Sequence, residues 1–288
     1  MKLRLALLVL VLIALGAGGA WWYLDALVPV PLASNEQRFV PGQPEFGEDE
    51  AVVEALLPAG PALDAFLVNQ SDLALLEKAP EGGWMGQLLA GLEGSRHGRR
   101  WRLAVRPGWR LQNGTMLDAA QMAKALAPEL GKLGGASRVV DGATLELRFR
   151  ARQEGLPALL TQWRVPGSGP FLRQGLTLTR FERFTPGRPG LAGVRISTDP
   201  ALLESRAWAE GLAARRWAWA VFPGHVAPED MARVRIAPYD EYRTKDGSVW
   251  FLSRRMRRLR PEPSDWARTR LFGVWRSSTE LPYDPLGF

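Results

Sequence analysis

The fold signal is strongest in the stretch Trp101-Arg102-Leu103-Ala104-Val105-Arg106-Pro107-Gly108-Trp109-Arg110-Leu111-Gln112-Asn113-Gly114-Thr115. Apolar and polar residues alternate from Trp101 to Arg106, as they do in a half-buried β-strand. Pro107-Gly108 predicts a turn, and Trp109 to Leu111 then resumes extended structure. Asn113-Gly114 is a strong hairpin-type turn signal. The stretch therefore predicts a strand, a turn and a second reversal of the chain.

Helices and strands alternate on both sides of this stretch. Asp118 is a suitable cap for a helix to about Leu130, with Met122 and Leu126 on its apolar face. Residues 143–149 alternate and form the clearest predicted strand. The other predicted elements are strands at 51–57, 176–181, 193–196 and 217–222, and helices at 156–163 and 201–214. This alternation predicts a mixed α/β domain.

The composition is that of a globular protein with few options for reactive chemistry. Hydrophobic residues make up 46% of the 288 residues and charged residues 23%, so a sizeable core is expected. Cysteine is absent, which excludes disulfides, thiolate nucleophiles and cysteine zinc sites. The two histidines, His97 and His225, are too few for a histidine metal cage. We therefore expect no metal and no cofactor.

The N-terminal segment reads as a membrane anchor. Lys2 and Arg4 precede an uncharged apolar run from Leu5 to Leu24. A helix needs about 20 such residues to cross the hydrocarbon core. The early positive charges predict a cytoplasmic N-terminus, so the rest of the chain lies on the extracytoplasmic (periplasmic or extracellular) side. We expect residues 1–24 to form a single-pass signal anchor in the cell membrane.

A cleavable signal peptide is the alternative interpretation of the same residues. Its apolar core would be Leu5 to Leu15, followed by the small residues Gly18-Gly19-Ala20. Trp21-Trp22-Tyr23 favours the retained anchor, because aromatic residues are enriched at membrane interfaces. Both interpretations place the folded part outside the cytoplasm, so a nucleic-acid partner is not expected. Residues 25–50, rich in Pro, Gly and acidic residues, are predicted to be a linker, and residues 51–288 the folded domain.

Several segments, in order, resemble extracellular solute-binding proteins of family 5, the oligopeptide/dipeptide/nickel type that serves ABC importers. Residues 101–115 resemble the family signature, and Asp118 to Met122 occupies the start of its following helix. Asp141-Gly142 and the strand after it are similar to the second strand pair of the family. Gly167 to Phe171 is similar to the family turn "GTGPY". Residues 186–196 and 208–222 also match in order.

The resemblance implies a fold and a function. The expected fold is an α/β, periplasmic-binding-protein-like (type II) lobe, a mixed sheet with flanking helices, with one N-terminal transmembrane helix. Family members are much longer, so the second lobe is expected to be largely missing. Asn113 stands where the family has Asp. The implied function is a membrane-anchored, non-enzymatic binding module for peptide transport, whose partner is a peptide-like solute, an ABC permease or an envelope protein.

The loop Gly167 to Phe171 is the leading candidate for ligand contact, because glycines let backbone groups approach a ligand closely. The alternative is a structural turn that joins strands. Aromatic side chains often line binding sites, and Trp109 and Trp163 are included for that reason. Packing in the core is the alternative, and the favoured one, for these two residues. The predicted ligand-binding residues are Trp109, Asn113, Trp163, Gly167, Ser168, Gly169, Pro170 and Phe171.

A basic run near the C-terminus is a second candidate surface, made of Arg254, Arg255, Arg257, Arg258 and Arg260. Outside the cytoplasm such a run indicates anionic lipid, cell-wall polymer or an acidic partner. A solvated strand or helix edge is the alternative. The net charge of the chain, +7, is also positive, but it does not distinguish among these partners.

Two other function classes remain open. An envelope hydrolase on an α/β domain would use Ser95 and His97, which lie in the basic segment Ser95 to Arg100. No third, orienting group and no oxyanion site can be identified from the sequence, so a solvated loop is expected there. The other alternative is a purely structural subunit of a membrane complex.

Overall fold

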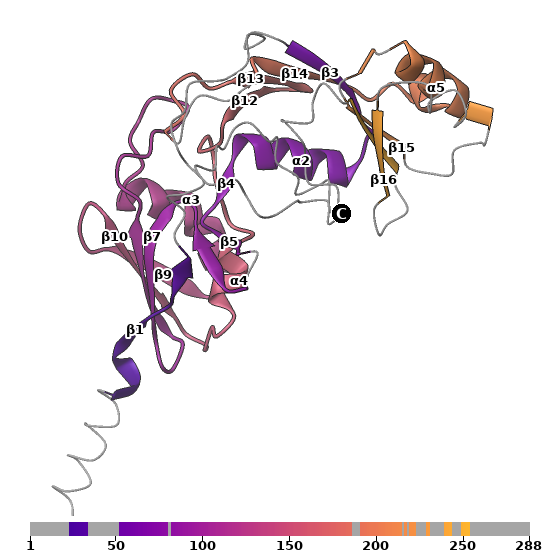
Figure 1. The fold of residues 1–288 in the computed structure, drawn as a ribbon. Coiled ribbons are helices and arrows are strands. Elements are labelled where there is room, and N and C mark those ends of the chain that lie inside the picture. Colours follow the sequence, from indigo (N-terminus) through magenta and orange to yellow (C-terminus); the bar gives the residue numbers. More distant parts are fainter. Residues whose placement is uncertain are drawn as a thin grey trace, which may run out of the picture. The chain divides into compact units, whose positions relative to one another are not determined.

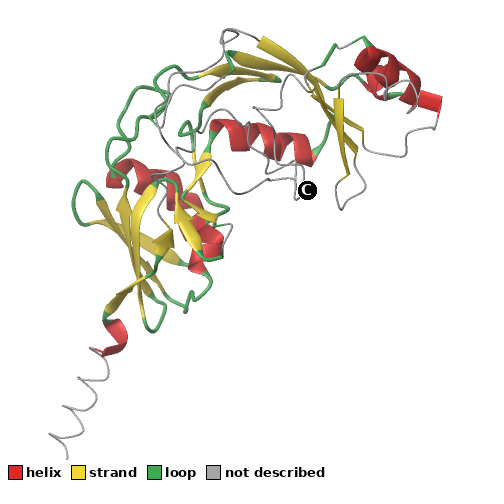
Figure 2. Ribbon diagram, viewed as in Figure 1, coloured by secondary structure: helices red, strands yellow, loops and turns green. Residues whose placement is uncertain are grey.

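The computed structural model describes residues 23–33, 52–79, 82–185, 191–214, 216–217, 219–222, 229–230, 239–243 and 249–253. Its contacts divide the chain into two compact units. Unit 1 contains residues 1–34, 74–109 and 116–165, and unit 2 contains residues 35–73, 110–115 and 166–288. Helices and strands occur in both units (Figures 1 and 2), which confirms the predicted mixed α/β class.

Unit 1 is built on a five-stranded antiparallel sheet in the order β1-β7-β8-β10-β9. Its strands are β1 (Leu27–Pro29), β7 (Leu89–Ser95), β8 (Arg100–Val105), β9 (Gly135–Val139) and β10 (Thr144–Phe149). Helix α3 (Ala119–Lys132) packs against β8, β9 and β10. Alternating residues of β8 and β10, among them Leu103 and Leu147, are buried together with Met122 and Leu126 of α3.

Short elements complete unit 1. Strands β2 (Leu32–Ala33), β5 (Leu76–Lys78) and β6 (Trp84–Gly86) form a small sheet in the order β2-β6-β5. Helix α4 (Leu156–Leu160) contacts β5, and β11 (Arg164–Val165) follows it. Strand β4 (Leu73–Ala74) lies where the chain passes from unit 2 to unit 1.

Unit 2 contains a seven-stranded mixed sheet in the order β12-β13-β14-β3-β15-β17-β16. Three neighbours, β14 (Gly193–Ser197), β3 (Val52–Leu56) and β15 (Trp219–Phe222), run parallel. The remaining strands are β12 (Phe171–Gln174), β13 (Thr177–Arg180), β16 (Tyr239–Arg243) and β17 (Val249–Ser253), all antiparallel to their neighbours. In β3 the exposure decreases along the strand, from the exposed Val52 to the fully buried Ala55 and Leu56.

Two helical segments accompany this sheet. Helix α2 (Pro61–Ser71) contacts β12. The 3-10 helix η2 (Pro200–Leu203) and helix α5 (Ser205–Ala213) form the second segment, and α5 contributes Trp208 and Leu212 to a cluster with Leu56 and Trp217. Trp208 and Trp217 are almost completely buried.

The structure confirms most predicted elements and corrects some bounds. Asp118 caps α3, its side chain accepting a hydrogen bond from the Gln121 amide at 2.7 Å. The helix predicted at 201–214 is broken at Glu204, whose backbone is extended and forms the cap position of α5. No regular strand forms at 109–111, because the Leu111 amide bonds the Thr115 carbonyl within the turn instead of a neighbouring strand. The predicted helix at 156–163 ends at Leu160.

The beginning of the predicted linker, residues 25–50, is folded. Leu27–Pro29 pairs with β7, and the Val30 amide donates to the Leu92 carbonyl at 2.8 Å. Leu32–Ala33 pairs with β6. Strands this short show no periodicity, and they are held by backbone groups of strands distant in sequence. The expected single domain over 51–288 is likewise divided between the two units.

The predicted membrane span lies almost entirely outside the described residues, which begin at Tyr23. Within the described part of the chain, no helix is long and apolar enough to span a membrane. The anchor therefore stays a prediction from the sequence.

Candidate functional site: the Gly167–Phe171 loop and the Glu146 network

The Gly167–Phe171 loop leads into β12 and lies against the end of helix α2. The Gly169 amide donates to the Ser71 carbonyl at 2.8 Å, and the Gly167 amide donates to a side-chain oxygen of Asp72 at 2.8 Å. In return the Leu73 amide donates to the Ser168 hydroxyl at 2.8 Å. The loop and the helix end thus satisfy one another's backbone groups, as buried backbone requires.

Gln112, in the turn at residues 110–115, forms hydrogen bonds to both the loop and the end of helix α2. Its backbone amide donates to the Gly167 carbonyl at 2.8 Å. Its side-chain amide nitrogen lies 3.1 Å from the Gly169 carbonyl and 2.8 Å from the Phe171 carbonyl. The same nitrogen lies 3.2 Å from the Ser71 carbonyl. Sequence reasoning did not select Gln112, and its position one residue before Asn113-Gly114 was the only signal available.

Gly169 occupies a place that no other residue fits. A Cβ atom there would lie 2.5 Å from the Ser71 carbonyl carbon and 2.6 Å from the Gln70 carbonyl oxygen. Both are backbone atoms, which cannot swing away. Gly167 is required for a different reason, since its φ of +68° is a conformation that L side chains rarely adopt.

The predicted ligand-binding residues are not equally accessible. Ser168 and Phe171 are fully buried, Gly169 and Pro170 are buried, and Gly167 alone in the loop is partly exposed. Asn113 is exposed, and its side-chain oxygen accepts from the Thr115 amide at 3.0 Å. The hydrogen bonds of Ser168, Gly169 and Phe171 to the end of helix α2 and to Gln112 support the structural-turn alternative for the buried part of the loop.

The remaining predicted residues lie elsewhere. Trp109 and Trp163 belong to unit 1, where both are buried, whereas the loop and Asn113 belong to unit 2. The arginine run from Arg254 to Arg260 and His225 lie outside the described residues.

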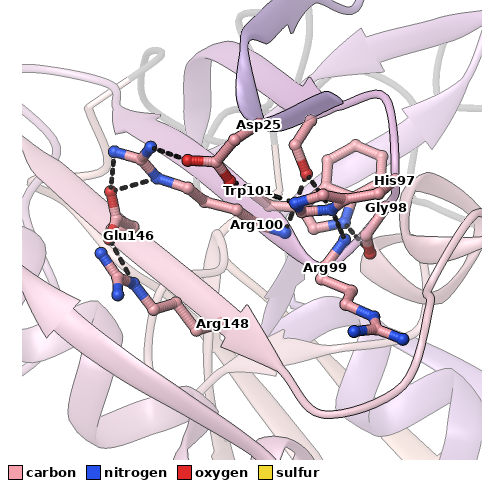
Figure 3. A network of polar contacts seen from close by, with 9 residues as sticks. Asp25, His97, Gly98, Arg99, Arg100, Trp101, Glu146 and Arg148 are labelled. Atoms are coloured by element: carbon pink, nitrogen blue, oxygen red, sulfur yellow. Dashed lines mark hydrogen bonds and ion pairs between the residues drawn. The ribbon is translucent and has the colours of Figure 1, made fainter. Parts of the chain in front are cut away.

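A second polar cluster, the Glu146 network, lies on the sheet of unit 1 (Figure 3). The Glu146 side chain on β10 is only 4% exposed and pairs with Arg100 of β8 at 2.9 Å and with Arg148 at 2.8 Å. Arg100 also contacts the Asp25 carboxylate at 3.0 Å. Buried carboxylates are tolerated only when they are paired and hydrogen-bonded in this way.

The charges of this network shift two pKa values. Burial acts to raise the pKa of Glu146, but hydrogen bonds and charges from Arg148 and Arg100 outweigh it, so the pKa lies below its usual value. Burial acts to lower the pKa of Arg100, and Glu146 and Asp25 outweigh it, so that pKa lies above its usual value. Both groups therefore stay charged at neutral pH.

His97 extends the Glu146 network to the turn between β7 and β8. The Arg99 amide donates to His97 Nδ1 at 3.0 Å, so this nitrogen is assigned as the acceptor and Nε2 carries the proton. The Nε2 atom lies 3.1 Å from Asp25 Oδ1, and the Ser95 hydroxyl lies 2.9 Å from Nδ1. Ser95, His97 and Asp25 thus form one hydrogen-bonded chain.

No cluster of three or more metal-ligating side chains occurs among the described residues. The two candidate arrangements described above are a set of carboxylates paired with arginines and histidine, and a loop bound through its backbone. Both arrangements hold segments distant in sequence against each other.

The fold is that of solute-binding proteins of ABC importers, which confirms the resemblance seen in the sequence. The oligopeptide-binding protein AppA from Bacillus subtilis, solved with a nonapeptide, has 13% sequence identity and a TM-score of 0.57, and the match covers 67% of this chain and 48% of that chain. A nickel ABC transporter structure from Bacillus halodurans has 18% identity and a TM-score of 0.53, covering 68% and 48%.

NikA from Brucella suis, solved with Fe(III)-EDTA, has 16% identity and a TM-score of 0.53, covering 65% of this chain and 48% of that chain. The chain thus spans about half the length of the solved structures that it matches. No family model and no curated protein matches the sequence. At identities this low, the structural likeness establishes the fold of the chain alone.

Proposed function

We propose that this chain is a non-enzymatic, extracytoplasmic binding module, held at the cell membrane by its N-terminal apolar segment, that binds a peptide-like solute. The observation that supports it is the solute-binding-protein fold over about two thirds of the chain. The apolar run Leu5 to Leu24 supports the location. The matched proteins are binding proteins, which supports a function without catalysis.

Only the exposed residues of the candidate site can contact a solute. Ser168 and Phe171 are buried and hold the loop in place, so they position the site. Gly167 and Asn113 reach the surface of unit 2, and Gln112 joins them through its bond to the Gly167 carbonyl. A solute would therefore meet the side-chain amide nitrogen of Asn113, a donor that suits the carbonyl groups of a peptide ligand.

Titration calorimetry of the full chain in nanodiscs against pools of short peptides tests this proposal. We expect heat of binding for at least one pool, weakened by Asn113→Ala through loss of one hydrogen bond, an effect of about 1 kcal/mol. Gln162→Ala, also exposed but in unit 1, is the matched control. Absence of heat at millimolar peptide would overturn solute binding.

Docking to an ABC permease or another envelope protein would then be the favoured alternative. Genes for an ABC permease next to the gene for this chain would support it. Their absence would favour a structural role in another membrane complex.

A hydrolase is the second candidate function, and the Ser95–His97–Asp25 chain of hydrogen bonds is the observation that favours it. These are the residue types of a serine triad, and the sequence had identified only two of them. Asp25 is 72 positions from His97 in the sequence, so no local pattern pointed to it.

The geometry nonetheless favours a structural role for these residues. Ser95 is only 5% exposed, and its hydroxyl oxygen accepts a hydrogen bond from the Arg100 amide at 3.0 Å. The lone pair of His97 Nδ1 that would take the serine proton already accepts the Arg99 amide. A fluorophosphonate probe labels activated serines, and we expect no labelling of the full chain. Labelling that Ser95→Ala abolishes would overturn this conclusion and establish a hydrolase.

A further inference from the structure

The turn between β7 and β8 is clamped to the residues that end the predicted membrane span. The Arg96 guanidinium carbon lies 3.8 Å from the centroid of the Tyr23 ring, and Tyr23 is 52% exposed. The His97 amide donates to the Leu24 carbonyl at 3.4 Å. The Asp25 carboxylate pairs with His97 and Arg100, and β1 begins at Leu27. Unit 1 therefore begins directly after the apolar run, with no free linker between them.

The same end of unit 1 carries a group of exposed arginines. The Gln153 amide donates to the Gly98 carbonyl at 2.9 Å, and the Phe149 amide donates to the Arg99 carbonyl at 2.8 Å. These bonds hold the loop at residues 150–153 beside the turn at residues 96–99. Both segments are rich in arginine, and we define the basic collar as Arg96, Arg99, Arg150 and Arg152, all exposed.

The basic collar has an excess of positive charge. Glu154 pairs with Arg152, and the nearby carboxylates of Asp25 and Glu146 are already paired with Arg100. Within the described residues no ion pair forms at Arg99 or Arg150. Arg99 is thus exposed on the turn that contacts Tyr23, and Arg150 is exposed on the loop bonded to that turn. The amphipathic aromatic belt of a membrane protein is expected at Tyr23.

We infer that the basic collar binds the headgroups of anionic phospholipids and holds this end of unit 1 against the membrane surface. This inference rests on the proposed anchor, because the span places Tyr23 at the headgroup level. The stacking contact then fixes Arg96 at the same depth. Basic residues near an anionic surface each contribute about fivefold to the binding constant, equivalent to ~1 kcal/mol, and only within about one Debye length.

The absence of cysteine allows a single fluorescent label to test the contact. Ala151→Cys places a polarity-sensitive dye between Arg150 and Arg152, and Ala127→Cys on helix α3 is the control position. The full chain is reconstituted into vesicles of phosphatidylcholine with or without phosphatidylglycerol. We expect the dye at 151 to shift to the blue and to resist quenching by acrylamide only when phosphatidylglycerol is present. The dye at 127 should not respond.

Charge reversal identifies the residues responsible. Arg99→Glu combined with Arg150→Glu should abolish the response at 151, whereas reversal of the exposed Lys124 on α3 should leave it intact. Thermal unfolding confirms that these variants fold. Extraction of the wild-type chain by alkaline carbonate would overturn the anchor and the headgroup contact with it. A carbonate-resistant chain whose dye at 151 responds equally to both vesicle types would overturn the headgroup contact alone.

Discussion

The side-chain amide of Gln112 donates a hydrogen bond to the Phe171 carbonyl at 2.8 Å, linking the Asn113-Gly114 turn to the start of β12. The same nitrogen also faces the carbonyls of Ser71 and Gly169. One side chain thus joins the end of helix α2, the candidate loop and the turn.

Replacing Gln112 by Glu should destabilise unit 2. The change keeps the shape of the side chain but turns its donor into an oxygen that faces three carbonyl oxygens. We expect a loss of about 1–3 kcal/mol in the free energy of unfolding, the range for an unsatisfied buried polar group. Urea denaturation monitored by tryptophan fluorescence measures it. Asn113→Asp, one residue away and exposed, is the control, and an equal loss in both variants would contradict the assigned role of Gln112.

Gly169→Ala should also destabilise the loop, because the added methyl group would overlap the backbone at Ser71 and Gln70. Overpacking against backbone costs about 1–3 kcal/mol. Gly155→Ala serves as the control, since a Cβ atom there meets nothing within 4 Å. Thermal unfolding of both variants decides the matter. Unchanged stability of the Gly169 variant would mean that the loop relaxes away from α2.

Stability should fall in acid because of Glu146. The folded-state pKa of this group lies below its unfolded value of about 4.3, so its contribution is complete above that pH. The contribution is lost as the pH falls through the lower, folded-state pKa. Unfolding free energies measured from neutral pH downward should therefore decrease, and Glu146→Gln should make the decrease less steep.

At neutral pH the Glu146→Gln variant should lose roughly 1–2 kcal/mol, because Arg100 and Arg148 lose a charged partner. The arginines are partly exposed, and solvent screening keeps the loss below that of a fully buried pair. A variant as stable as the wild type at both neutral and acid pH would show that the Glu146 network contributes no net stability.

Hydrogen exchange should detect the docking of the first residues of unit 1. The Val30 amide and the β1 amides bonded to β7 should be protected, in contrast to those of a free linker. Asp25→Asn weakens the ion pairs to His97 and Arg100, and we expect a local loss of roughly 0.5–1 kcal/mol in protection. Glu93→Gln, which loses a surface pair with Arg102, is the control. Equal protection in both variants would show that Asp25 does not help to hold β1 against β7.

Much of the fold was predictable because its signals are local. The alternation from Trp101 to Arg106 predicted β8, and Asp118 with its apolar face predicted α3. Such patterns arise because each strand or helix buries one face of its own residues. Strands β1, β2, β6 and β12 were missed, since two to four residues are too few for a period to show. The longer strands β7, β9, β16 and β17 were missed as well.

The candidate site was predictable only in part. The Gly167–Phe171 segment was identified by its glycines and prolines, but its partners were not. Asp72 and Gly167 are 95 positions apart in sequence, so nothing local connects them. The burial of Ser168 and Phe171 was equally hidden, because it depends on contacts with the end of helix α2 and with Gln112, which are distant in sequence.

The sequence by itself determined the mixed α/β class, the order of the main elements, the resemblance to solute-binding proteins, and the apolar segment at the N-terminus. These depend on periodicity, turn chemistry and composition, which neighbouring residues carry. Tertiary structure alone decided that Gln112 holds the loop and that Asp25 joins Arg100 and His97. Those contacts depend on how strands distant in sequence pair, and pairing of that kind is fixed by the packed chain as a whole.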